Sequence, residues 1–183
     1  MSTSQPVADP WSSPLPAWLK RVYAAPGALY DHGLGRLLGH RFVRIGHIGR
    51  RTGLLHHAVV EVTHYDRVTG EATVMAGYGP RADWVRNIRA AGGASLDFGH
   101  GPRPAAYRVL DVDEAIEVFR HYERRNVLLL PGIRATLWVL LGWRYDGSEP
   151  ARRRLAEQLP MLAFRPVGYG SHLPDKPGPA LGA

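Results

Sequence analysis

The sequence contains no cysteine and only two lysines, Lys20 and Lys176. Without cysteine, the chain has no disulfide framework, no thiol nucleophile and no cysteine-ligated metal, which fits a reducing cytoplasm. Because lysine is so rare, 21 of the 23 basic side chains are arginines, and the net charge is +7. The planar guanidinium of arginine binds two oxygens at once, so this composition favours an anionic partner: a polyanionic cofactor, a nucleic acid or a membrane surface.

Long apolar runs are also missing. Residues 127–143 form the most apolar segment, but proline, glycine and arginine interrupt it, and its unbroken part is much shorter than the roughly 20 residues that span a bilayer. We expect a buried helix or a lid over a pocket here, with peripheral membrane contact through Trp138 and Trp143 as the alternative. No N-terminal stretch resembles a signal peptide, so we expect a cytoplasmic protein.

The signatures of common catalytic and metal sites are absent. There is no Gly-x-Ser-x-Gly elbow for a hydrolase and no His-Glu-x-x-His zinc motif. The neighbouring His56 and His57 would point to opposite faces of a strand, where they could not chelate one ion together, so we predict no metal site. His47 and His64 are expected to be ordinary barrel or surface residues.

Nucleic-acid binding is not predicted, despite the basic composition. The arginine run at residues 152–154 is expected to be a solvated helix face. Aromatic residues are not interleaved with the arginines, as they are where successive bases stack on a protein.

The ends of the chain differ in composition from its middle. Residues 1–16 are polar and proline-rich and predict a flexible arm, whereas residues 167–183 are rich in glycine and proline and predict a disordered tail. Residues 17–166 are predicted to form a single cofactor-binding domain. It begins with apolar residues at helical spacing over residues 17–38, interrupted at Pro26 and Gly27. This amphipathic helix either packs on the domain or lies on a membrane surface.

Short alternating apolar segments predict an antiparallel sheet. We expect strands at residues 42–48, 54–65, 71–76, 95–98, 105–110 and 159–164, and helices at residues 81–91 and 113–126. The first three strands should form a meander, because the turns between them are too short for parallel crossovers. Six or so strands with helices at the periphery predict an α+β fold built on a small antiparallel barrel.

Two segments that combine glycine with arginine carry the strongest functional signal. The first is the turn Gly49-Arg50-Arg51-Thr52-Gly53, and the second is Gly77-Tyr78-Gly79-Pro80-Arg81-Ala82-Asp83-Trp84, which opens a helix. Glycines let backbone N–H groups converge on an anion, arginines add forked donors, and a helix N-terminus adds a positive dipole. The two segments therefore predict the two halves of one site for a phosphate-bearing redox cofactor.

The order of these segments resembles the deazaflavin-dependent nitroreductase family. Members of this family use coenzyme F420 on the split β-barrel fold that they share with FMN-binding pyridoxamine-phosphate oxidases. The resemblance covers residues 42–166 and includes Asp113-Glu114-Ala115 and the closing segment Leu-Pro-Met-Leu-Ala-Phe-Arg-Pro. It implies an antiparallel split β-barrel of the pyridoxamine-phosphate-oxidase type, with peripheral helices, an N-terminal amphipathic helix and pairing into a homodimer.

The resemblance also implies which residues bind the cofactor. In the family, the first turn and the following strand hold the phosphate tail, and a Trp-x-x-Asn pair lies beside the cofactor. Carried over to this chain, the cofactor-binding residues are Gly49, Arg50, Arg51, Thr52, Gly53, His56, Ala58, Val59, Gly77, Tyr78, Gly79, Pro80, Arg81, Trp84 and Asn87.

The chain departs from the family pattern after the first turn. Family members commonly have an arginine and then Thr-Pro on this strand, whereas the chain has His56 and then Ala58 and Val59. A longer, lysine-containing loop before the helix is also missing. His56 and Arg81 are the residues that could replace these cations.

The implied activity is that of an F420H2-dependent reductase, which transfers a hydride from reduced deazaflavin to a small electrophile such as a quinone, an enone or a nitro compound. Tyr78, His56 and Tyr122 are candidate proton donors. One alternative is an oxidoreductase that binds FMN in the same groove. The other is a non-catalytic carrier of a cofactor, lipid or haem, or a membrane-surface module that uses the N-terminal helix.

Overall fold

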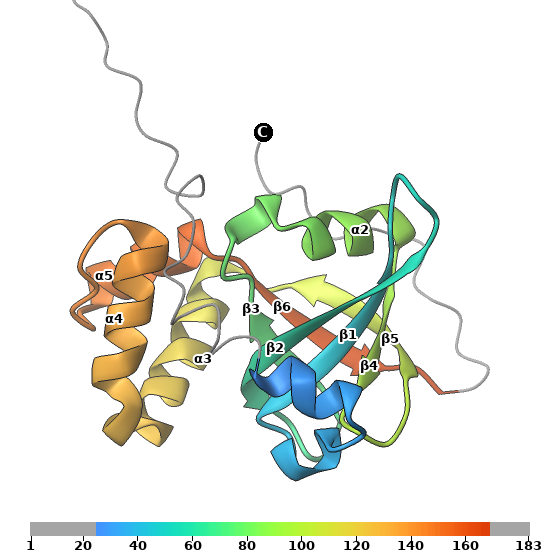
Figure 1. The fold of residues 1–183 in the computed structure, drawn as a ribbon. Helices are drawn as coiled ribbons and strands as arrows, with labels where there is room; N and C mark the ends of the chain where they lie inside the picture. The colour runs from blue at the N-terminus through green and yellow to red at the C-terminus, as the bar shows by residue number, and fades with distance from the viewer. Residues whose placement is uncertain (1–24, 169–183) are drawn as a thin grey trace, which may run out of the picture.

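The computed structural model describes residues 25–168, whose six strands form a closed antiparallel barrel in the order β1-β2-β3-β6-β5-β4 (Figure 1). The strands are β1 (Phe42–Ile48), β2 (Leu55–Tyr65), β3 (Ala72–Met75), β4 (Ala94–Asp97), β5 (Arg103–Val109) and β6 (Met161–Pro166). The predicted meander of the first three strands is confirmed. With its peripheral helices, the molecule has the predicted α+β split-barrel fold.

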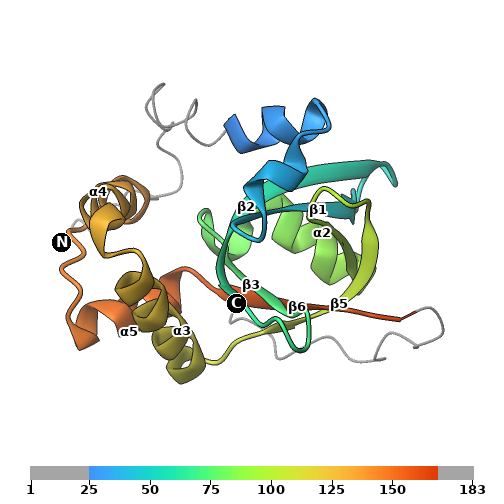
Figure 2. The same cartoon turned by 90° about the horizontal axis from the view of Figure 1, so that it is seen from below.

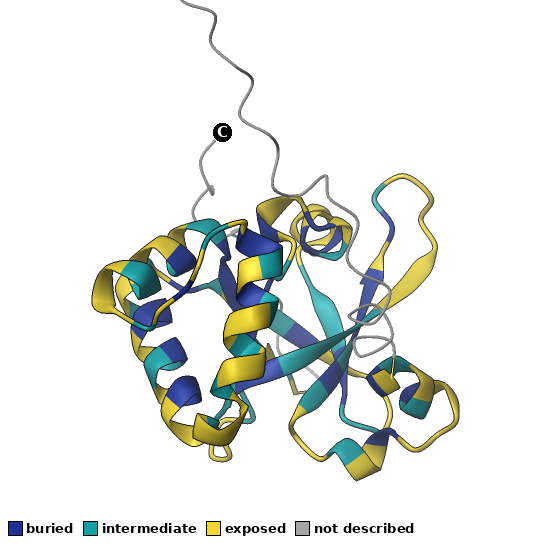
Figure 3. Ribbon diagram, turned by 60° about the vertical axis from the view of Figure 1, so that its left-hand side comes forward, coloured by how far each residue is buried: buried dark blue, intermediate teal, exposed yellow. Residues whose placement is uncertain are grey.

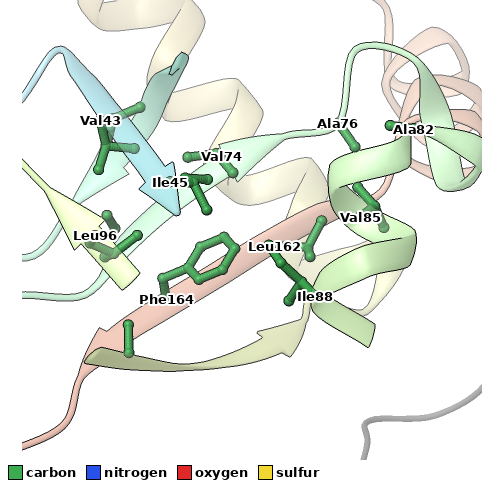
Figure 4. Packing of buried hydrophobic residues seen from close by; sticks show 13 residues of the cluster. Val43, Ile45, Val74, Ala76, Ala82, Val85, Ile88, Leu96, Leu162 and Phe164 are labelled. Carbon is green, nitrogen blue, oxygen red and sulfur yellow. The ribbon is translucent and has the colours of Figure 1, made fainter. Parts of the chain in front are cut away.

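Alternation along the strands builds the interior of the barrel. Val43 and Ile45 of β1 are fully buried, and they meet Val74 of β3 and Phe164 of β6 inside the barrel (Figure 4). Successive side chains of a strand point to opposite faces, so every second residue of β1 reaches this core.

Two helical segments lie at opposite ends of the barrel. Helix α2 (Asp83–Ala91), preceded by the 3-10 turn η2 (Gly79–Arg81), buries Val85 and Ile88 against one end. At the other end, the 3-10 turn η1 (Gly35–Leu38) leads to His40, whose ring stacks on Tyr65 at a centroid distance of 3.9 Å. Figures 1 and 2 show α2 and the blue N-terminal segment on different sides of the barrel.

The described part of the N-terminal segment is a helix at residues 25–31, which includes Pro26 and Gly27. A turn follows at Gly33, which has a φ of 72° and suits the left-handed region that other residues avoid. The predicted interruption at Pro26 and Gly27 depends on residues before 25 and stays a prediction. The part of the predicted helix before residue 25, the predicted arm and almost all of the predicted tail lie outside the described residues, so the domain limits at residues 17 and 166 stay predictions.

Three helices form a layer beside the barrel: α3 (Val112–Arg125), α4 (Leu130–Leu141), which follows the 3-10 turn η3 (Val127–Leu129), and α5 (Glu149–Gln158) (Figure 1). Their core includes Phe119, Leu137 and Leu155. The helix face predicted for residues 152–154 belongs to α5, although the bounds of this helix were not predicted. Its Arg152 is also not a freely solvated residue, because Arg152 Nε donates a 2.7 Å hydrogen bond to Glu123 Oε2, and buried Glu123 requires a partner.

The apolar segment 127–143 is only half buried. Leu137 and Leu141 of α4 pack on the helical layer, while Trp138 is 61% exposed and Leu128 of η3 is 94% exposed, so one side of this layer presents exposed residues (Figure 3). The prediction of a buried helix is therefore correct for one face of α4 only. Between residues 25 and 168, no helix is both long enough and apolar enough to cross a bilayer.

Candidate functional site

A groove with a volume of about 810 Å³ separates the β1–β2 turn from the start of α2. It brings the two glycine–arginine segments together, as the sequence predicts. Its walls are formed by His47, Gly49, Arg50, Arg51, Thr52, His56, His57, Ala58, Tyr78, Arg81, Ala82, Asp83, Trp84 and Asn87.

The β1–β2 turn depends on its glycines. The Gly53 N–H donates to Gly49 O at 2.8 Å, and Gly53 has a φ of 68°, which favours glycine. A Cβ on Gly49 would lie 2.5 Å from Thr52 Oγ1 and 2.9 Å from His56 Nε2. The two glycines thus fix a tight turn that holds Thr52 and His56 close together, with 3.4 Å between Thr52 Oγ1 and His56 Nε2.

Arg50 joins the two segments physically. Its backbone N–H and its Nη1–H both donate to Asn87 Oδ1, at 3.1 and 2.8 Å, and its Nη2–H donates to Asp83 Oδ1 at 2.9 Å. The hydrogen bond from Arg50, followed by the charge of Arg50, holds the pKa of the Asp83 carboxyl below its ordinary value. Arg50 therefore braces the turn against α2, and two of its five N–H donors are already used.

Arg51 and Arg81 add positive charge to the groove lining. Both side chains are exposed, and Arg51 forms no ion pair with a described residue. The α2 helix begins after Ala82, which has no side chain able to cap the first backbone N–H groups. Uncapped N–H groups and exposed guanidinium groups suit an anion such as phosphate.

Most of the predicted cofactor residues lie in the groove, but some do not. Gly53, Val59, Gly77, Gly79 and Pro80 are outside the lining. Gly79, with a φ of 64°, shapes the turn that leads into α2 rather than the groove surface. Gly77 lies near α4, where an added Cβ would be in ordinary contact with Leu140 at 3.7 Å.

The three candidate proton donors are separated by the fold. Tyr78 and His56 line the groove, and burial raises the pKa of the Tyr78 hydroxyl. Tyr122 belongs to the core of the helical layer, where it is 5% exposed and its hydroxyl donates to Glu61 Oε1 at 3.0 Å. Tyr122 is thus not brought to the groove, in keeping with its core-facing position on α3.

Four groove residues are not among the named cofactor-binding residues: His47, His57, and Ala82 and Asp83, which belong to the second glycine–arginine segment. His47, expected to be an ordinary barrel or surface residue, is the most informative of them. Asn87 Nδ2 lies 3.1 Å from His47 Nδ1, and burial, followed by the charges of His56 and His57, lowers the pKa of His47. His47 pairs with His56 across β1 and β2. The prediction that His56 binds the cofactor could therefore have indicated His47 as well.

Neither a protein-family model nor a curated protein matches the chain. Solved structures with a similar fold include an F420-H2 dependent reductase (16% identity, TM-score 0.42, covering 68% of this chain and 93% of that one). Another is an FMN-binding protein related to pyridoxamine 5'-phosphate oxidase from Nostoc punctiforme (12% identity, TM-score 0.43, 86% and 83% covered). A third is described as a domain-swapped dimer (15% identity, TM-score 0.45, 81% and 99% covered). At such identities the likeness concerns the fold alone.

Proposed function

We propose that this protein is an F420H2-dependent reductase that transfers a hydride from reduced deazaflavin to a small electrophilic acceptor, such as a quinone, an enone or a nitro compound. The observation that carries the proposal is the meeting of the Gly49–Gly53 turn and the start of α2 across one cationic groove. These are the two segments on which the resemblance to deazaflavin-dependent reductases rests.

The groove residues fit the two chemical parts of such a cofactor. Arg51, Arg81 and the uncapped N-terminus of α2 suit the phosphate and the acidic tail. Tyr78, Trp84 and the methyl groups of Ala58 and Ala82 supply flat or apolar surface for a ring. His56 occupies the strand position of the family arginine and faces the same groove.

A bound deazaflavin supplies the hydride, and the chain supplies binding, orientation and a proton. Tyr78 is the better-placed proton donor, because its side chain lines the groove and is 48% exposed, so an acceptor can reach it. Burial raises the pKa of its hydroxyl, which is protonated at neutral pH. His56, held beside Thr52, is the second candidate.

The test is a titration of the purified protein with F420, followed by cofactor fluorescence, with FMN titrated in parallel. We expect micromolar affinity for F420. Arg51→Glu should weaken binding by at least about tenfold, because it replaces an attractive charge by a repulsive one at the phosphate. Arg67→Glu makes the same charge change at an exposed position in the β2–β3 turn and should leave the affinity unchanged.

Each outcome of the titration separates this proposal from its alternatives. A preference for FMN would move the protein to the flavin-dependent oxidoreductases of the same fold. Binding of neither cofactor would favour the non-catalytic carrier. An unchanged dissociation constant for Arg51→Glu would remove the phosphate site from the turn.

We further propose a cytoplasmic homodimer that contacts membranes only peripherally. Light scattering of the purified protein tests the dimer, and a monomer mass would contradict it. Leu34 and Leu37, which are 46% and 76% exposed, support membrane contact by the N-terminal segment. Co-sedimentation with anionic liposomes should then be lost when the residues before His40 are deleted, and persistence of binding would contradict this role.

A further inference from the structure

His47 is held by a hydrogen bond whose direction can be assigned. Asn87 Oδ1 accepts from the backbone N–H and the Nη1–H of Arg50, so the atom of Asn87 that faces His47 is the amide nitrogen Nδ2. An amide nitrogen donates and does not accept. His47 Nδ1, 3.1 Å away, is therefore the acceptor and carries no proton.

The proton of the neutral ring must then reside on Nε2. The surroundings favour a neutral ring, because burial and the charges of His56 and His57 on β2 lower the pKa of His47, while Asp83 on α2 opposes them weakly. Arg50 is the other charged group in this network, and it reaches His47 only through Asn87.

The Nε2 atom of His47 opens into the groove. Within residues 25–168 it has no hydrogen-bond partner, although the side chain is only 6% exposed. Over the same residues, Arg44 Nε is the fully buried side-chain nitrogen or oxygen that has no hydrogen-bond partner. His47 Nε2 also has no partner but is not fully buried, so it must touch solvent. The solvent next to this ring is the groove that His47 lines. The nearly parallel His56 ring lies across the strand pair, with 5.9 Å between the ring centroids.

We propose that His47 is a ligand-binding residue that donates its Nε2–H to an anionic phosphate or carboxylate oxygen in the groove, with Asn87 and Arg50 as positioning residues. Arg51 and Arg81 line the same space and select the same class of ligand. That this ligand is the tail of F420 rests on the proposed function, whereas the state of the His47 ring does not.

The ring state is measured by two-dimensional nitrogen NMR of protein labelled with ¹⁵N in histidine, with His47 assigned from the His47→Gln variant. In the free protein at pH 7 we expect the Nε2–H tautomer. Inorganic pyrophosphate or glutamate, added separately to distinguish phosphate from carboxylate, should shift the Nε2 resonance. A proton on Nδ1, or an Nε2 signal that moves with neither anion, would overturn the proposal. A shift caused only by the uncharged acceptor menadione would also overturn it.

Asn87→Asp provides a second test within the same network. An aspartate still accepts from Arg50, but it can only accept from the ring, so Nδ1 should gain a proton and the His47 pKa should rise. An unchanged tautomer in Asn87→Asp would contradict the assigned direction of the hydrogen bond.

Binding measurements test the donor itself. His47→Phe keeps a ring but removes the donor, and it should raise the dissociation constant for pyrophosphate and for F420 by about tenfold. His47→Gln, which places an amide donor near the Nε2 position, should raise it by less than about threefold. His64→Phe, on β2 outside the groove, is the control and should bind as wild type. Wild-type affinity in His47→Phe would overturn the proposal. If pyrophosphate shifts Nε2 but F420 does not bind, the His47 site stands and the proposed function fails.

Discussion

Arg50 and Asn87, which are 37 residues apart, are joined by two hydrogen bonds to a single oxygen: Arg50 N and Arg50 Nη1 lie 3.1 and 2.8 Å from Asn87 Oδ1. This contact ties the tip of the β1–β2 hairpin to α2. It also orients the other end of the Asn87 amide toward His47. The Asn87 side chain thus connects the turn to α2 and fixes the direction of the hydrogen bond to His47.

The first prediction concerns the stability that this contact contributes. Asn87→Leu keeps a side chain of similar size but leaves the Arg50 N–H and His47 Nδ1 without their partner, so we expect a loss of about 1–3 kcal/mol in the free energy of unfolding. Urea denaturation measures it. Arg86→Ala, an exposed position on the same helix, should change the stability by less than about 0.5 kcal/mol. Equal midpoints for Asn87→Leu and wild type would mean that the contact adds nothing to stability.

The second prediction concerns the interior of the barrel. Phe164 of β6 is fully buried among the strands and α2 (Figure 4), and Phe164→Ala leaves a cavity that the closed barrel can fill only in part. We expect a loss of about 3–5 kcal/mol, measured by chemical denaturation. Val68→Ala removes apolar atoms at a site that is 94% exposed and should have almost no effect. A loss below about 1 kcal/mol for Phe164→Ala would contradict a well-packed barrel core.

The third prediction concerns acid stability. Burial by itself would raise the pKa of Asp97, but hydrogen bonds from the Arg44 side chain and from the Gly99 and Gly101 N–H groups outweigh it, so the pKa lies below its ordinary value of 3.8. Because the folded-state pKa is below the unfolded one, Asp97 stabilises the fold above about pH 4, and this stabilisation is lost as the pH falls through the folded-state pKa.

Asp97→Asn should therefore lower the unfolding free energy at pH 7 by about 2 kcal/mol and flatten its decline below pH 4. Unfolding curves recorded between pH 7 and pH 2 measure both effects. Asp113→Asn is the control, since the Asp113 side chain is 81% exposed and its ion pair with Arg153 lies on the surface. An acid limb as steep in Asp97→Asn as in wild type would assign the acid sensitivity to other carboxyl groups.

Local patterns predicted the elements whose residues alternate clearly. The predicted strand at residues 42–48 coincides with β1, and the short turn predicted between the second and third strands joins β2 to β3. The arginine run at residues 152–154 predicted a helix face, but not the bounds of α5, because this helix is rich in charged residues and buries only Leu155. Ser148, which accepts a hydrogen bond from the Ala151 N–H, and the proline in the first turn were the signals that could have revealed it.

The sequence by itself determined the strands, the Gly49–Gly53 turn and the cationic character of the groove, because each depends on residues that are neighbours along the chain. Only the tertiary structure decided that Tyr122 lies in the helical layer while Tyr78 lies at the groove. It also decided that His47 meets Asn87, 40 residues further on. Such contacts depend on the packing of α2 across one end of the closed barrel. The spacing of residues along the chain does not encode this packing.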